Sequence, residues 1–169
     1  MTLFIECMIG IVLFTSSVVP ITLKDPLGSV GDYPPAIRER CIKLKLIPET
    51  KKRFTGKEII KKTIAMIVFI PILAFIVFKF NGADSLLKGF IDSYIIWLAV
   101  DWYDAFILDC IWFCHSDKVK IKGTEDMTEY KDYLFHIKQS CIGTLLGLPV
   151  CLSVGLTIVL FVSVFHFTP

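Results

Sequence analysis

The sequence lacks the short motifs that identify many soluble enzymes. It contains no Walker A loop, no dinucleotide-binding glycine fingerprint, no H-E-x-x-H motif and no G-x-S-x-G motif. Only three of the 169 residues are histidine, so the chain has no histidine-box array of the kind that a membrane di-iron enzyme needs. Nothing indicates sequence-specific nucleic-acid binding, and we expect no nucleic-acid partner. These absences exclude several large enzyme classes.

Charged residues are also few, at 20% of the chain, whereas 54% of the residues are hydrophobic. The apolar residues form stretches of about 20 residues or more, which is the length that a helix needs to cross a bilayer. An ordinary soluble domain and a disordered chain are both excluded. The sequence therefore predicts one all-α, polytopic membrane domain over residues 1–169. We expect four spans at about 3–22, 62–80, 86–113 and 140–165, joined by long loops at 23–61 and 114–139.

The basic residues predict how this domain is oriented in the membrane. Eleven of the eighteen Lys and Arg residues lie between Lys24 and Lys62, and five more lie in the loop 114–139. By the positive-inside rule, both long loops should be cytosolic and both termini outside, in a bacterial plasma membrane or its equivalent. The basic first loop could also bind anionic lipid headgroups, although topology alone would explain its charge.

Two segments give signals for where helices begin. Thr55 and Glu58 form a capping box, which predicts that the helix of the second span starts near Thr55. In the second loop, Tyr130, Leu134 and Ile137 have helical spacing. We therefore expect the fourth helix to begin in the cytosol, with Thr124 or Asp126 as its N-cap, and to continue into the membrane.

The fourth span carries a small residue at every fourth position. These residues would lie on one helix face and let another helix approach closely in lipid. The pattern predicts tight packing, either within the chain or between the copies of a homo-oligomer that meet through this helix. The four residues are Gly143, Gly147, Cys151 and Gly155.

The third span contains acidic residues that are costly to place in a bilayer. Asp101 and Asp104 lie near the middle of the span, three residues apart, and so share a face of a regular helix. Two neighbouring carboxylates in a low dielectric should share a proton or a cation. On a regular helix the same stripe would also contain Trp97, Leu108, Trp112 and His115, with Asp109 turned partly away.

A second set of polar residues lies on the predicted cytosolic side. Glu129, Asp132 and His136 would line one face of a helix and are candidate ligands for a divalent metal. A solvated face with ion pairs is the alternative interpretation. The six cysteines predict no disulfide, and Cys110, Cys114 and His115 do not have the spacing of a haem-attachment motif.

Three hypotheses for function follow from these residues. The first is movement of a cation or of protons, with Asp101 and Asp104 as carriers, a site shaped by Trp97, Trp102 and Tyr103, and His115 as a relay. The second is an enzyme at the cytosolic interface that uses Asp101, Asp104, Asp109, His115, Asp132 and His136. The third is a structural or accessory membrane subunit. The sequence identifies no cofactor and does not decide among these.

Overall fold

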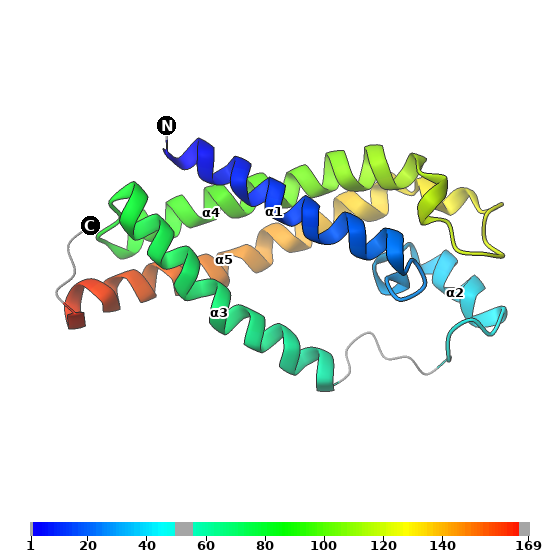
Figure 1. Cartoon of the computed structure of the whole chain (residues 1–169), viewed down its shortest axis with the longest axis horizontal. Coiled ribbons are helices and arrows are strands. Elements are labelled where there is room, and N and C mark those ends of the chain that lie inside the picture. Colours follow the sequence, from blue (N-terminus) through cyan, green and yellow to red (C-terminus); the bar gives the residue numbers. More distant parts are fainter. Residues whose placement is uncertain (1, 50–55, 166–169) are drawn as a thin grey trace. The chain divides into compact units, whose positions relative to one another are not determined.

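The computed structural model describes residues 2–49 and 56–165, and these residues form helices and loops without a strand. The helical elements follow one another along the chain (Figure 1). The longer ones are α1 (Thr2–Lys24), α2 (Pro35–Lys43), α3 (Gly56–Asn81), α4 (Leu86–Tyr103), the π-helix η2 (Asp104–Trp112) and α5 (Tyr133–Phe165). Short 3-10 turns are η1 (Val30–Asp32), η3 (Phe113–His115), η4 (Asp117–Val119) and η5 (Thr128–Lys131). The all-α prediction is confirmed.

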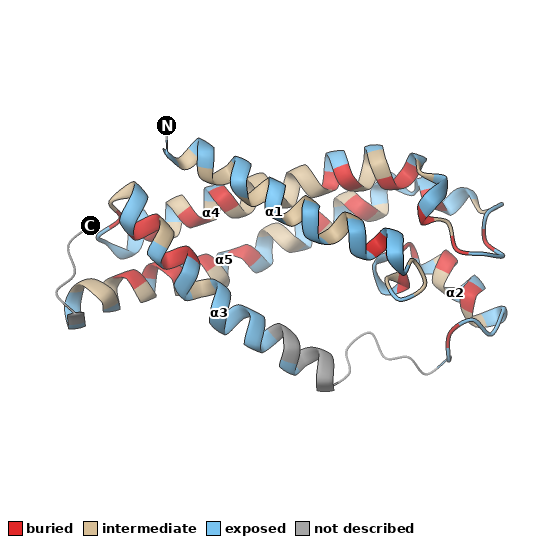
Figure 2. Ribbon diagram, viewed as in Figure 1, coloured by how far each residue is buried: buried red, intermediate tan, exposed pale blue. Residues whose placement is uncertain are grey.

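Three helices of the described chain are long and apolar enough to cross a membrane. They are α1, residues Thr63–Asn81 of α3, and residues Tyr133–Val164 of α5. Helix α4 is not among them, since its 18 residues include the charged Lys88, Asp92 and Asp101. Much of the apolar surface of the three helices is exposed, as the pale blue stretches of Figure 2 show. Extended exposed apolar surface of this kind is typical of a protein that contacts lipid.

The described residues divide into two compact units. We call residues 2–11, 56–101 and 142–165 the bundle unit, and residues 12–49 and 102–141 the loop unit. In the bundle unit, α3, α4 and α5 share one apolar core, against which Leu3 and Cys7 of α1 also pack. The buried members of this core are Leu73, Ala74, Val77, Phe78, Ala83, Ile96, Val154 and Ile158.

The small residues of α5 pack against α4 of the same chain. A Cβ added to Gly147 would lie 2.5 Å from the Trp97 ring, and one added to Gly155 would lie 2.6 Å from the Leu86 carbonyl oxygen. Gly143 is similarly close to the Asp101 carboxylate, and Cys151 is fully buried. The predicted close approach of helices therefore occurs within the chain, which was one of the two alternatives for this stripe.

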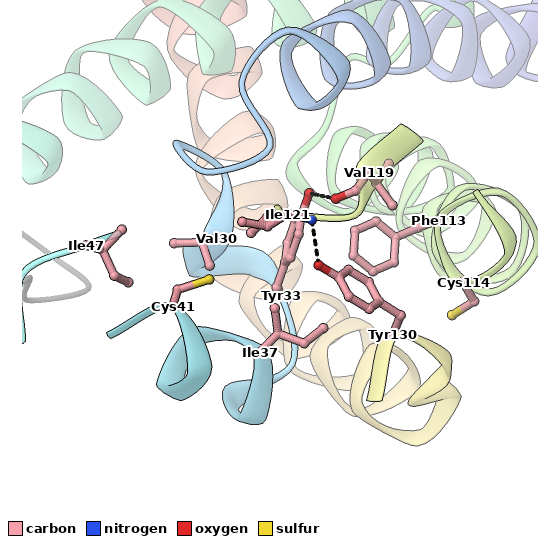
Figure 3. Packing of buried hydrophobic residues seen from close by; sticks show 10 residues of the cluster. All are labelled: Val30, Tyr33, Ile37, Cys41, Ile47, Phe113, Cys114, Val119, Ile121 and Tyr130. Carbon is pink, nitrogen blue, oxygen red and sulfur yellow. Dashed lines mark hydrogen bonds between the residues drawn. The ribbon is translucent and has the colours of Figure 1, made fainter. Parts of the chain in front are cut away.

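The loop unit has a core of its own, built from both long loops (Figure 3). The Tyr33 hydroxyl donates to the Val119 carbonyl at 3.0 Å, which joins the first loop to the second. The Tyr130 hydroxyl accepts the Ile121 N–H at 2.8 Å and lies 2.7 Å from the Thr124 hydroxyl. Because these polar groups are paired where they are buried, the described parts of the two loops can share one core without unsatisfied groups at these positions.

Helix α2 packs its apolar face into this core. Ile37 and Cys41 are fully buried, whereas Arg40 and Lys43 are exposed. A surface-lying amphipathic helix would bury its apolar face in the bilayer instead. Any interaction of α2 with lipid is thus limited to its charged side.

Helix α5 begins at Tyr133, so the predicted N-caps Thr124 and Asp126 are wrong. The cap is Asp132, whose Oδ1 accepts the Phe135 N–H at 2.9 Å. The helical spacing upstream is interrupted at Asp132, because Thr128–Lys131 is a separate 3-10 turn. The prediction that this helix starts before residue 140 is nevertheless correct. Helix α3 begins at Gly56, close to the predicted start, while the Thr55–Glu58 capping box lies outside the described residues.

The close contact of α4 with α5 predicts that Gly155→Ala destabilises the protein. The new Cβ would meet backbone atoms of α4, which cannot move cheaply, and overpacking of this kind costs about 1–3 kcal/mol. Gly31→Ala is the matched control, because nothing lies within 4 Å of a Cβ at Gly31. Thermal unfolding of the purified protein in detergent should show a lower midpoint for Gly155→Ala alone. Equal midpoints for the two variants would contradict tight packing of this helix pair.

Candidate acidic pocket

The chain changes its helical winding at Asp104. Helix α4 ends at Tyr103, and Asp104–Trp112 continues as a π-helix, in which hydrogen bonds run from residue i to residue i+5. Residues five apart, such as Asp104 and Asp109, therefore come to neighbouring positions on successive turns. The single stripe expected to continue from Asp104 to His115 on a regular helix is wrong for this reason. Segments of π-helix are rare and often occur at functional sites.

This π-helix forms one wall of a pocket in the loop unit, with a volume of about 310 Å³. The other walls come from α1, the first loop and the beginning of α5. The lining residues are Phe14, Val18, Thr22, Ser29, Asp32, Tyr33, Asp104, Leu108, Asp109, Trp112, Phe113, Phe135, His136 and Gln139. Three of them are aspartates and none is lysine or arginine, so the described lining is acidic as well as aromatic.

A pair formed by a buried histidine and a partly exposed aspartate is part of this lining. The Nδ1 atom of His136 lies 3.0 Å from Oδ2 of Asp109, and the His136 side chain is only 3% exposed. A carboxylate accepts hydrogen bonds, so the proton of this bond belongs to Nδ1. The Nε2 atom is buried and has no hydrogen-bond partner among the described residues. The ring is therefore oriented by Asp109, and its second nitrogen is enclosed without a hydrogen-bond partner among the described residues.

Asp101 belongs to the bundle unit and is bound to α5. Its Oδ2 accepts a hydrogen bond from the Thr144 hydroxyl at 3.0 Å. Two further side chains of α4 donate to α5 carbonyls, Trp97 to Gly143 at 3.1 Å and Tyr94 to Thr144 at 3.2 Å. Asp101 and Trp97 thus take part in helix pairing, whereas Asp104 lines the acidic pocket.

The remaining residues predicted to shape a transport site have other neighbours. Trp102 packs against Phe106 with ring centroids 5.3 Å apart, and Tyr103 is half-buried. His115 is exposed; its Nδ1 lies 3.0 Å from the Ile111 carbonyl, and its Nε2 lies 3.2 Å from the Tyr133 hydroxyl. It lines a second pocket of about 330 Å³, whose described walls carry both acidic and basic residues.

The candidate metal ligands do not converge. Glu129 lies in a 3-10 turn, the Asp132 carboxylate caps α5, and His136 pairs with Asp109. Across the described chain, no three His, Cys, Asp or Glu side chains come together in a way that could hold a metal ion. The expectation that Glu129, Asp132 and His136 share one helix face is wrong, because the helix starts only at Tyr133.

Asp32 and Tyr33 are among the lining residues that were not predicted from the sequence. They follow a turn-rich segment and come directly before Pro34 and Pro35, where no periodicity indicates a direction for side chains. Burial, with smaller contributions from Tyr130 and Asp32, raises the pKa of the Tyr33 phenol. Tyr33 therefore stays protonated at neutral pH and keeps its bond to the Val119 carbonyl.

Comparison with known proteins finds no matching family model, no similar curated protein and no similar solved structure. The interpretation of the pocket therefore rests on the chemistry of its own residues.

The environment of Cys114 predicts an unreactive thiol. Burial, together with Cys110 and Asp109, raises the pKa of this thiol to about 12. At pH 8 very little of this thiol is therefore in the reactive thiolate form, and the side chain is buried as well. With the other cysteines replaced, Cys114 should react with iodoacetamide orders of magnitude more slowly than a cysteine placed at exposed Lys118. Comparable labelling rates at pH 8 would contradict this description of the loop unit.

Proposed function

We propose that the chain is an integral membrane protein with four spans, formed by α1, α3, α4 together with η2, and α5. The length and apolar character of α1, α3 and α5 support three of them. The fourth is supported by the position of α4, which shares the apolar core of the bundle unit with α3 and α5. Its polar side chains find partners on α5, and this pairing reduces the cost of placing them in lipid.

We further propose that both long loops are cytosolic and that both termini lie outside. The core of the loop unit supports a common side, because Tyr33 of the first loop packs with Val119 and Tyr130 of the second. Segments that share one core lie on one side of a membrane. The basic residues of the two loops favour the cytosol as that side.

This topology predicts that exposed positions in the turn before α4 and in the two long loops are labelled from opposite sides of the membrane. In a cysteine-free background, a cysteine at Asp84, between α3 and α4, should react with a membrane-impermeant maleimide in intact cells. Cysteines at Lys43 and Lys118, one in each loop, should react only after the cells are permeabilised. Labelling of Asp84→Cys and Lys118→Cys from the same side would rule out the arrangement in which α3 and α4 both cross the bilayer.

As to activity, we propose that the protein moves protons or a small cation by way of the acidic residues of its third span. The pairing of His136 with Asp109 at the acidic pocket carries this proposal. A histidine can take up a proton at one ring nitrogen and release one from the other, and its ordinary pKa lies near neutrality. Buried ionisable groups at the end of a span are typical of proton and ion pathways.

In this proposal Asp104, Asp109 and His136 form the exchange site on the side of the loops. Asp101 lies one turn earlier in the chain and receives the Thr144 hydrogen bond. It is a candidate for a second carrier, because it is an acidic residue within the predicted third span. Asp101 and Asp104 are the two carriers expected from the sequence. Asp109 and His136 would act together with Asp104 at the exchange site.

Flux measurements on liposomes test this proposal. Wild-type protein should dissipate an imposed pH gradient or carry a cation, detected with an internal pH dye or with ion-sensitive dyes. Asp104→Asn and Asp101→Asn should each lower the flux at least about tenfold, because the asparagine amide cannot take up and release a proton near neutral pH. Asp84→Asn, which removes an exposed aspartate from the turn before α4, is the matched control and should retain wild-type flux.

Flux in wild-type liposomes equal to that in empty liposomes would refute transport, as would wild-type flux in both Asp101→Asn and Asp104→Asn. Monodisperse elution of each variant after purification separates a loss of function from a loss of fold.

The geometry of the same pair favours an enzyme as the second candidate. Asp109 orients His136 through Nδ1 and leaves Nε2 as a potential general base, which is the arrangement of base and orienting carboxylate in nucleophilic catalysis. Such a base could act on a water molecule or a hydroxyl at the membrane interface. Absence of flux together with an intact fold would favour this candidate.

We also propose that the basic first loop binds anionic lipid headgroups. Support comes from the exposed Arg40, Lys43 and Lys45, which lie on and directly after α2. Because the apolar face of α2 is buried in the protein, the binding would be electrostatic and would weaken with salt.

A further inference from the structure

We propose that the turn at the end of helix α2 docks onto an anionic lipid bilayer, with its leucines in the interfacial region and its lysines among the headgroups. The turn consists of Lys43, Leu44, Lys45 and Leu46, and we call it the Lys43–Leu46 turn. This inference rests on the proposed topology and on the proposed binding of anionic headgroups, and it names the residues that would enter the bilayer. Binding through α2 itself would be electrostatic, whereas the turn adds an apolar contribution.

The turn exposes apolar side chains directly beside basic ones. Leu44 and Leu46 are 41% and 39% exposed. Lys43 and Lys45, which alternate with them in the sequence, are exposed as well. At a membrane interface, exposed apolar side chains enter the boundary of the acyl chains while ammonium groups stay among the headgroups. The turn therefore offers both kinds of contact that an anionic bilayer accepts.

The backbone at Lys45 is left-handed, with a φ of 58°, and no other non-glycine residue of the described chain has a positive φ. Two hydrogen bonds hold this conformation. The Lys45 N–H donates to the Ile42 carbonyl at 2.9 Å, and the Leu46 N–H donates to the Cys41 carbonyl at 3.0 Å. Glycine is the usual residue at this position of a helix end, because it has no Cβ. A lysine at a position that favours glycine points to a function of its side chain.

The second loop adds a further lysine beside this turn. Leu44 lies against Gly123, where an added Cβ would be 2.9 Å from Cδ1 of Leu44. Lys122, which is exposed, directly precedes Gly123 in the sequence. Glu125 lies here too, but its Oε2 accepts the Gly123 N–H at 2.7 Å. The Lys43–Leu46 turn and Lys122 therefore form one basic surface to which both loops contribute.

The charge of this surface favours an anionic partner. Lys43, Lys45 and Lys122 take part in no ion pair within the part of the chain that the structure describes. Their ammonium groups are therefore not neutralised by the protein. Each lysine close to an anionic bilayer strengthens the binding about fivefold. Three such lysines together with two exposed leucines fit an anionic bilayer by both charge and polarity.

The position of the turn in the chain favours the membrane over a soluble partner. Helix α1 ends at Lys24 and the apolar part of α3 begins at Thr63, so the proposed topology anchors the chain to the bilayer before and after the turn. A tethered surface meets its partner at a high effective concentration, so weak contacts are sufficient. An acidic segment of another protein would have to be recruited from solution. The bilayer is therefore the partner to which we assign this surface.

Fluorescence quenching at two depths in the full-length protein tests the inference. In the cysteine-free background, Leu44→Cys carries the fluorophore NBD, and the protein is reconstituted in phosphatidylcholine vesicles with or without about one third phosphatidylglycerol. A nitroxide on the lipid acyl chain should quench this label in the anionic vesicles and much less in the neutral ones. The same label at Lys118→Cys, an exposed position elsewhere in the second loop, is the matched control and should stay unquenched.

Variants separate the effects of charge, apolar contact and fold. Lys45→Gly and Lys122→Gln should each weaken docking about fivefold, whereas Lys131→Gln, at another exposed lysine, should dock like wild type. Lys45→Arg keeps the charge and should also dock like wild type. Lys45→Gly should leave the thermal midpoint unchanged or raise it, because glycine adopts the left-handed backbone without the steric cost of a Cβ. Leu46→Asn should reduce quenching by the acyl-chain nitroxide several-fold.

No acyl-chain quenching of the label at Leu44→Cys, or equal quenching at Lys118→Cys, would overturn the inference. Unchanged docking in Lys45→Gly or in Lys122→Gln would overturn it as well. An unquenched turn that binds a soluble poly-glutamate peptide would overturn it in favour of an acidic protein segment. Quenching by a headgroup nitroxide alone refutes insertion but leaves the proposed headgroup binding intact, whereas equal quenching in neutral and anionic vesicles refutes both.

Discussion

The structure depends on the close approach of α4 and α5. A tyrosine hydroxyl, an indole N–H and a carboxylate lie on α4 within a predicted span, and in an apolar environment each of them needs a partner. Helix α5 supplies the Gly143 and Thr144 carbonyls and the Thr144 hydroxyl. These bonds require the helices to be nearly in contact, and the glycines of α5 allow this because they have no side chains. The small residues of α5 and the polar residues of α4 are therefore complementary parts of one helix interface.

The change to π-helical winding gives the segment after α4 a different role from that of α4 itself. A regular helix would keep Asp109 away from the face of Asp104, whereas i→i+5 bonding brings residues five apart to neighbouring positions. Both aspartates then line one pocket, and Asp109 reaches His136 at the start of α5. A π-helix is less favourable than an α-helix, so it persists where surrounding contacts compensate for it. The Asp109–His136 pair is one such contact.

Much of the helical framework can be predicted from the sequence, because long apolar runs leave few alternatives to membrane helices. Helix α3, for example, begins close to the expected residue, and α5 begins before residue 140 as expected, although not at the predicted caps. The grouping of the site residues cannot be predicted in the same way. Asp104, Asp109 and His136 are all candidates from the sequence, but regular periodicity assigns Asp109 to another face and groups His136 with Glu129 and Asp132. Periodicity contains neither the π-helical winding of η2 nor the break at Asp132, where the aspartate side chain caps α5 by accepting the Phe135 N–H.

The core that the two loops share fixes which loop segments lie together, and the hydropathy pattern alone does not predict this pairing. Tyr33 and Val119 are far apart in sequence, and their hydrogen bond joins segments that precede α3 and follow η2. The same core supplies Tyr33 and Phe113 to the acidic pocket, so the residues that fix the loops also line the site. A ligand that occupied the pocket would therefore contact the first loop, the π-helix and α5 together. Its binding energy would stabilise the arrangement of these three segments. Occupancy of the pocket would therefore be coupled to the conformation of the π-helix η2.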